Sequence, residues 1–338
     1  MSAIRFGITL QGVEPPRAFQ EQVRALEGHG FTHLWITDSS LHARYVYSYL
    51  TLAALNSTRL RLGTGITHPF TRHPGVTVNA IATIDEISEG RAMLGLGTGD
   101  SPTMELGYAP APVRIVREMI DVARRMMAGE TLTYQGSTFE LVNAHLHYKL
   151  RDRIPIYLAC SGPRMLALAG EVADGVIVQV GVFPEAIDYA LARIREGAAR
   201  AGRSLDEIDV WIMLCGSISD EREKATQRSR TMAAWFAQTA PHYCELAGLE
   251  PALIARIRAA YSGGEFHQAQ AAAALVPDRM VELFTLAGTV GEARERVERL
   301  IAHGVTSFNF MPTGAERRAS IDLFAREILR PLAGVAPA

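Results

Sequence analysis

The chain alternates short runs rich in β-branched and aromatic residues with longer runs whose apolar residues recur at helical spacing. In the first repeat, residues 4–9 have the character of a strand, and residues 19–29 carry Phe19, Val23 and Leu26 on one helical face before Gly30. This alternation is typical of parallel strands joined by crossover helices. Eight strands are predicted, over residues 4–9, 33–37, 60–65, 92–95, 156–160, 175–179, 208–214 and 307–311. Eight such units favour a closed (β/α)8 TIM barrel over an open doubly wound sheet.

Two intervals between predicted strands are longer than a single crossover requires. Residues 131–141, after the fourth strand, are predicted to form a hairpin with Gln135 and Gly136 at its turn. The other interval, between the seventh and eighth strands, holds an insertion at about residues 216–304. Because no linker rich in Pro, Ser or Gly divides the chain, we predict one domain over residues 1–338 with insertions after strands 4 and 7. Such insertions usually shape the mouth of a barrel's active site.

Composition and charge argue against several classes of function. Of the 338 residues, 48% are hydrophobic and 21% are charged, which is the balance of a globular protein. The net charge is −2 and no basic run is present, so we expect no nucleic-acid partner. No stretch of about 18 apolar residues exists and the first residues lack an apolar signal core, so we expect no membrane segment and a cytoplasmic location. The three cysteines stand far apart, which predicts buried free thiols.

A glycine-rich segment follows the fourth predicted strand. Its sequence, Gly95-Leu-Gly-Thr-Gly-Asp100, does not match the dinucleotide fingerprint, because the third glycine stands at position 99. The segment does place backbone N–H groups, the Thr98 hydroxyl and the Asp100 carboxylate at the end of a strand, where barrel enzymes form their active sites. We interpret it as a functional loop, with a tight glycine turn as the alternative.

A second segment, Cys160-Ser-Gly-Pro-Arg164, joins the fifth predicted strand to a helix. The free N–H groups of a helix N-terminus and the arginine beside them are suited to form a cup for a phosphate. A simple N-cap by Ser161 followed by Pro163 explains part of the same pattern. Both interpretations stay open at this point.

Two further strand ends carry candidate residues. Asp38 closes the second strand, where a carboxylate is more often functional than a solvated surface acid, with a helix N-cap as the alternative. Gly63 and Gly65 close the third strand and predict a bulge or an unusual peptide where a planar ligand approaches the backbone. His145 and His147 fit a surface pair better than a metal site, because no third ligand stands at metal spacing.

Several segments, taken in order, identify a family. They are Leu34-Trp-Ile-Thr-Asp38, Tyr47-Ser-x-Leu-Thr-x2-Ala-Leu-Asn56, Thr71-Arg-x-Pro74, Ile84-x-Glu-Ile-Ser-x-Gly-Arg-Ala92, Gly95-Leu-Gly-x-Gly-Asp100, Ile154-Pro-Ile-Tyr157, Gly162-Pro-x-Met-Leu166 and Leu168-Ala-Gly-Glu-x-Ala-Asp-Gly175. Together they resemble the bacterial-luciferase-like superfamily, most closely its deazaflavin branch, typified by methylenetetrahydromethanopterin reductase. An ordered series that spans nearly the whole chain is more specific than any one motif.

The resemblance implies a flavin-like ring lying across the carboxyl ends of the barrel strands, supplied by coenzyme F420 or alternatively by FMN. It implies a non-prolyl cis peptide behind the ring, at Gly65–Ile66. Asp38 would border the ring, and Thr98, Gly99 and Asp100 would line its pyrimidine side or the cofactor tail. Ser161, Gly162 and Arg164 would hold the tail or a phosphate, and Gln179, Val180 and Gly181 would complete the wall. Asp38 and Asp100 are the candidate catalytic residues, and we expect Asp100 to manage protons and Asp38 to position the ring.

Two residues depart from the family pattern. Ser39 stands where deazaflavin relatives commonly have His, and Thr9 stands where the reductases have Glu; both changes touch acid/base chemistry and substrate recognition. The leading prediction is an oxidoreductase that moves a hydride between coenzyme F420 and a small organic substrate, as a homodimer. The alternatives are an FMN-dependent monooxygenase that uses O2 and separately supplied reduced flavin, and a barrel that has kept the fold without catalysis.

Overall fold

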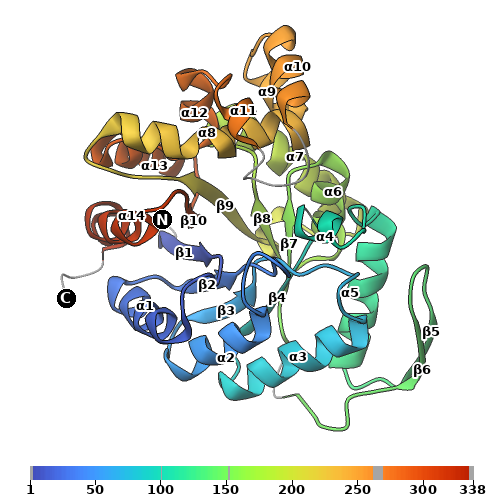
Figure 1. Cartoon of the computed structure of the whole chain (residues 1–338). Helices are drawn as coiled ribbons and strands as arrows, with labels where there is room; N and C mark the ends of the chain where they lie inside the picture. Colours follow the sequence, from blue (N-terminus) through green and yellow to red (C-terminus); the bar gives the residue numbers. More distant parts are fainter. Residues whose placement is uncertain (1–2, 100, 151–152, 262–268, 335–338) are drawn as a thin grey trace.

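The computed structural model describes residues 3–99, 101–150, 153–261 and 269–334. Eight parallel strands close into a barrel in the order β1-β10-β9-β8-β7-β4-β3-β2 (Figure 1). The strands are β1 (Arg5–Leu10), β2 (His33–Ile36), β3 (Arg61–Thr64), β4 (Ala92–Leu96), β7 (Ile156–Cys160), β8 (Gly175–Val178), β9 (Asp209–Gly216) and β10 (Ser307–Pro312). The (β/α)8 barrel predicted from the sequence is confirmed.

Helices follow the strands and surround the barrel (Figure 1). Helix α1 begins at Pro16, where no N–H needs a partner. Its C-cap is Gly30, whose φ of 97° lets its N–H reach two carbonyls of the last turn. The helices around the barrel are α1 (Pro16–His29), α2 (Val46–Leu55), α3 (Pro74–Ile87), α5 (Val113–Met127), α6 (Pro163–Val172), α7 (Pro184–Arg200), α13 (Val290–Ala302) and α14 (Arg317–Phe324). A π-helix (Ala325–Leu329) and α15 (Arg330–Ala333) continue α14, and a 3-10 turn (Leu205–Glu207) precedes β9.

Two long connections add further elements. Between β4 and β7 the chain forms α4 (Ser101–Glu105), α5 and an antiparallel hairpin of β5 (Leu132–Gln135) and β6 (Glu140–Ala144), which confirms the predicted hairpin at Gln135 and Gly136. Between β9 and α13, the chain forms a group of helices that pack against α8. These helices are α8 (Arg222–Thr239), α9 (Pro241–Leu246), α10 (Pro251–Ala260), α11 (Gln270–Ala273) and α12 (Asp278–Phe284).

The barrel interior is filled by large side chains that alternate with outward-facing residues along the strands. Trp35, Tyr157 and Trp211 are buried there in a cluster separate from the larger core between strands and helices. Toward the amino ends of the strands, Asp209 accepts hydrogen bonds from Tyr157 and Trp211, both at 2.8 Å, and pairs with Arg5. This end is therefore closed by a polar network, and the carboxyl ends carry the candidate residues.

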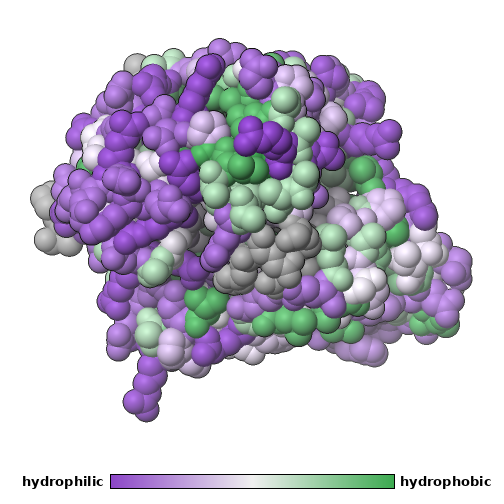
Figure 2. Space-filling view, turned by 45° about the horizontal axis from the view of Figure 1, so that its top comes forward, coloured by the Kyte–Doolittle hydropathy of each residue, from purple (hydrophilic) through white to green (hydrophobic). Residues whose placement is uncertain are grey.

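The surface and the thiols agree with a folded globular chain. Hydrophobic residues gather in the middle of the face shown in Figure 2, and hydrophilic residues predominate along its left edge. No helix in the described ranges combines the length and the apolar character needed to cross a membrane. All three cysteines are buried and free, as predicted.

Candidate active site

Glycines let the ends of β2, β3 and β4 approach one another closely. A Cβ at Gly63 would lie 2.5 Å from ring carbons of Trp35, and a Cβ at Gly65 would lie 2.6 Å from the Trp35 Cβ. The pair at 63 and 65, interpreted from the sequence as room for a ligand, thus makes room for a buried tryptophan. The predicted cis peptide at Gly65–Ile66 is confirmed. Beyond it, Ile66 lies against Gly97, where an added Cβ would be 2.1 Å from the Ile66 Cδ1 atom.

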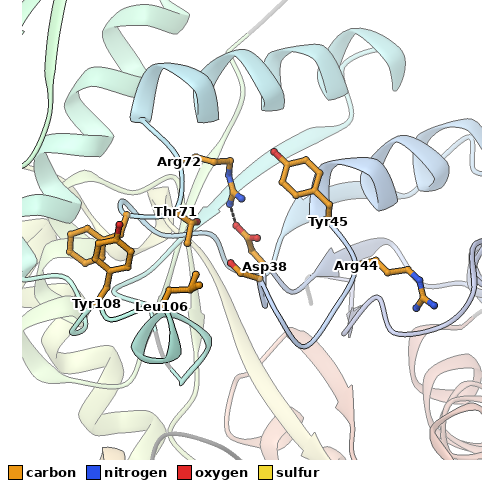
Figure 3. Close-up of a pocket in the computed structure, with 9 residues that line it drawn as sticks. Asp38, Arg44, Tyr45, Thr71, Arg72, Leu106 and Tyr108 are labelled. Atoms are coloured by element: carbon orange, nitrogen blue, oxygen red, sulfur yellow. Dashed lines mark ion pairs between the residues drawn. The ribbon is translucent and has the colours of Figure 1, made fainter.

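Asp38, just after β2, is held by two residues of the loop that follows β3. The Thr67 hydroxyl donates a 2.6 Å hydrogen bond to Asp38 Oδ2, and the Arg72 guanidinium forms an ion pair with the same oxygen. Arg72 also donates to the Thr67 hydroxyl at 2.7 Å. Figure 3 shows the Arg72 and Asp38 side chains pointing toward each other from their separate loops. Asp38 is therefore a buried, positioned carboxylate.

A cavity of about 460 Å³ opens beside this pair. On one side the rings of Phe70 and Tyr108 are stacked, with centroids 5.2 Å apart and planes inclined by 9°. Arg44 also lines the cavity, and its guanidinium donates to the Val13 carbonyl. The lining combines charged, hydroxyl and aromatic groups: Asp38, Ser40, Arg44, Tyr45, Phe70, Thr71, Arg72, Leu106 and Tyr108 (Figure 3). A cavity of this character suits a polar molecule with a flat ring.

The loop after β4 has the backbone that its glycines predict. Gly99 has a φ of 84°, and a Cβ there would lie 2.8 Å from the Thr103 hydroxyl, so only glycine fits. The Thr98 carbonyl accepts a 2.6 Å hydrogen bond from the Ala111 N–H, which fixes the loop. Asp100, the predicted proton-handling residue, lies outside the described residues.

The predicted anion cup is the N-terminus of α6. Gly162 is the N-cap residue, and an added Cβ would meet no atom within 4 Å, so open space adjoins the free backbone N–H groups. Arg164 is exposed and makes no hydrogen bond or ion pair with another described residue. The hydroxyl of Tyr243, a buried residue of α9, donates to the Ser161 carbonyl at 2.9 Å. The long connection after β9 thus holds the loop at Ser161 in place. The sequence analysis did not predict this contact.

The residues after β8 form a tight turn next to the cup. The Gln179 N–H donates to the Cys160 carbonyl at 3.1 Å, and Gly181 has a φ of 104° that favours glycine. Val180 is fully buried in this turn, between Gln179 and Gly181.

The two departures from the family pattern occupy different environments. Thr9 is buried in β1, where its hydroxyl accepts a 2.8 Å hydrogen bond from the side-chain amide of Asn309. The Asn309 Oδ1 atom is buried and has no hydrogen-bond partner among the described residues. Ser39 begins a turn, and its carbonyl accepts from the N–H groups of His42 and Ala43.

Comparisons with known proteins connect this arrangement to particular relatives. The sequence profile of the family described as luciferase-like monooxygenase matches residues 2–307. A 5,10-methylenetetrahydromethanopterin reductase of Methanolobus tindarius is 34% identical over 328 residues, covering 96% of this chain and 99% of that protein. An F420-dependent glucose-6-phosphate dehydrogenase of Nakamurella multipartita is 32% identical over 246 residues, covering 68% of this chain and 73% of that protein. The solved structure of the coenzyme F420 dependent tetrahydromethanopterin reductase of Methanopyrus kandleri superimposes with a TM-score of 0.85 at 30% identity, covering 98% of this chain and 100% of that one.

Proposed function

Because this chain belongs to the luciferase-like monooxygenase family, and reductases and dehydrogenases that use coenzyme F420 are among its relatives, we propose that it is an F420-dependent oxidoreductase acting on a small organic substrate. The family predicted from the sequence is confirmed. The observation that carries the activity is the near full-length identity of 34% to a methylenetetrahydromethanopterin reductase. Members of one family can perform different reactions, so the proposal also requires that the residues of the site fit the cofactor.

The cup at α6 fits an anionic group of the cofactor. It offers free N–H donors at the N-terminus of a ten-residue helix and open space at Gly162. Arg164 adds a cation that no described residue neutralises. Ser161, Gly162 and Arg164 would therefore hold the charged tail, with Tyr243 fixing the loop from behind.

The strand ends between Asp38 and β8 fit a flat ring. Ile66 and Gly97 form an apolar, closely packed wall, and Asp38 supplies a fixed acceptor at its edge. Thr98, Gly99 and Asp100 would line the ring or the tail, and the turn at Gln179, Val180 and Gly181 would complete the wall. When bound, F420 would supply the carbon that gives or takes a hydride. The protein's part is to position the ring and to exclude water from it.

Titration of the purified protein with F420 and, separately, with FMN tests the proposal. We expect F420 to bind, followed by its ring fluorescence, and reduced F420 to be oxidised without O2 when a suitable substrate is added. The phosphate of FMN would suit the same cup, so FMN is the matched competitor. Binding of FMN alone, with turnover that consumes O2, would replace the proposal by a flavin monooxygenase.

We also propose that the active form is a homodimer in the cytoplasm. Leu55, at the end of α2, is 68% exposed and Val76, in α3, is 54% exposed, although α2 and α3 pack together. Exposed apolar side chains on adjacent helices are typical of an interface between subunits. Sedimentation velocity would test this, since a monomer at micromolar concentration would contradict it.

A further inference from the structure

Arg72 is the structurally unusual residue of the site, because a charged side chain is buried there beside an acid. It belongs to the loop between β3 and α3, and its side chain is 10% exposed. Its guanidinium carbon lies 5.2 Å from the ring centroid of Tyr47 and 5.5 Å from that of Tyr45. Its other side meets Asp38 and Thr67. An arginine placed between aromatic faces and a carboxylate is held in one orientation.

The ion pair leaves the two oxygens of Asp38 unequal. Oδ2 takes both the Thr67 hydroxyl and the Arg72 guanidinium, whereas Oδ1 has no hydrogen-bond partner among the described residues. Asp38 lines the cavity, so Oδ1 is the oxygen available to a ligand. A guanidinium at contact distance favours the charged carboxylate, which can only accept hydrogen bonds.

We propose that Arg72 is a positioning residue that keeps Asp38 ionised and turned so that Oδ1 accepts a hydrogen bond from the bound cofactor or substrate. The inference rests on the proposed function for the identity of the ligand, and on the Arg72, Thr67 and Asp38 contacts for the role of the arginine. Arg72 then acts through Asp38 and does not itself bind the ligand.

Other titratable groups lie near Asp38 and Arg72. In the β3–α3 loop, the His68 ring forms a 3.3 Å hydrogen bond with the Thr71 hydroxyl, and burial lowers the pKa of His68 to about 4. Burial lowers the pKa of Arg72 to about 10 and raises that of Tyr47 above its usual value. Arg44, Tyr45 and Tyr108 also line the cavity, and His42, in the loop after β2, pairs with Glu105 at 2.7 Å. A His42→Gln variant therefore serves as a control for this nearby pair.

The test is a double-mutant cycle on the dissociation constant of F420, measured by fluorescence from pH 5.5 to 8 against free F420 at each pH. The variants are Arg72→Met, Asp38→Asn and their combination, since methionine keeps the length and packs well on tyrosine rings. Arg72→Lys keeps the charge without the planar fork. Arg44→Met removes a positive charge from the same cavity, and His42→Gln removes the nearby imidazole.

We expect Arg72→Met to weaken binding about tenfold or more at pH 6 and less at pH 8, because burial raises the pKa of a carboxyl without a cationic partner toward neutral pH. In the Asp38→Asn background the same change should cost at most about twofold and lose its pH dependence. Relative to Arg72→Met, Arg72→Lys should bring the pH dependence of binding back toward that of the wild type, while its affinity for F420 stays lower. Arg44→Met and His42→Gln should keep the pH profile of the wild type.

An equal loss with and without Asp38 would show that Arg72 contacts the ligand itself and would overturn the inference. So would a flat pH profile of Arg72→Met with wild-type affinity. Absence of F420 binding by the wild type would instead overturn the proposed function. If Arg72→Met does not fold, Thr67→Val and Arg72→Lys are measured in its place. Each weakens one contact to Asp38 Oδ2 and replaces the side chain by one of similar size.

Discussion

Gly95 and Gly97 stand two residues apart at the end of β4, yet alanine at each position should fail in a different way. A Cβ at Gly95 would lie 1.9 Å from the carbonyl oxygen of Thr64, a backbone atom that moves only if β3 moves. A Cβ at Gly97 would lie 2.1 Å from the Cδ1 atom of Ile66, the far end of a side chain that can rotate. Overpacking usually costs about 1–3 kcal/mol. We expect about 1 kcal/mol of lost stability for Gly97→Ala, and about 3 kcal/mol or failure to fold for Gly95→Ala.

The milder substitution, Gly97→Ala, should still impair function. Ile66 is part of the proposed wall behind the cofactor ring, so a displaced Ile66 should lower F420 affinity about tenfold or more in the otherwise folded Gly97→Ala protein. Urea unfolding by circular dichroism gives the stability, and fluorescence titration gives the affinity. Gly291→Ala, in α13 with no atom within 4 Å of the added Cβ, is the control and should leave affinity unchanged. Wild-type affinity and stability of Gly97→Ala would refute the assignment of Ile66 to the wall.

Three further changes test other parts of the molecule. Arg164→Ala should weaken F420 binding by about 1–3 kcal/mol at an unchanged urea midpoint, with the exposed Arg195→Ala as control; full affinity would show a surface role. Tyr243→Phe removes the donor to the Ser161 carbonyl, so it should cost about 1 kcal/mol of stability and lower the affinity for F420. Unchanged affinity would show that α9 does not influence cofactor binding at the cup. Burial lowers the pKa of His33 to about 3 and that of His68 to about 4, so below about pH 6.5 the unfolded chain binds protons that the folded chain does not. Stability should fall as pH drops through this window, and His33→Asn should reduce the slope by up to about 1.4 kcal/mol per pH unit; an unchanged slope would contradict a buried, neutral His33.

Features that depend on neighbours in sequence could be predicted. The hairpin that turns after Gln135, beginning at Gly136, and the helix C-cap at Gly30 follow from local backbone preferences, and both are present in the structure. Alternating strands and helices predicted the barrel, because each parallel strand needs a crossover. The cis peptide at Gly65–Ile66 came from the family resemblance, since paired glycines allow several backbone shapes.

Contacts between distant segments could not be predicted. Tyr243 and Ser161 are 82 residues apart, and no helix was assigned to the connection that brings them together. A buried arginine such as Arg72 has no local signature, because its burial depends on Tyr45 and Tyr47 in another element. Gly63 and Gly65 were predicted to leave room for a ligand, whereas the structure shows that the Trp35 side chain already requires glycine at both positions. Sequence reasoning therefore located the strand ends and missed the side chains that support them.

The Thr9 departure limits which acid/base chemistry this chain can perform. Thr9 and Asn309 form a buried hydroxyl–amide pair between β1 and β10, and neither group ionises near neutral pH. The family resemblance implies a glutamate at this position in the reductases, where this chain has a neutral hydroxyl. Among the described residues that line the cavity, the carboxylate is Asp38, and Arg72 pairs with it. If the reaction requires a proton, a group other than Thr9 or Asn309 must supply it, and Asp38 would serve as a fixed acceptor beside the ligand.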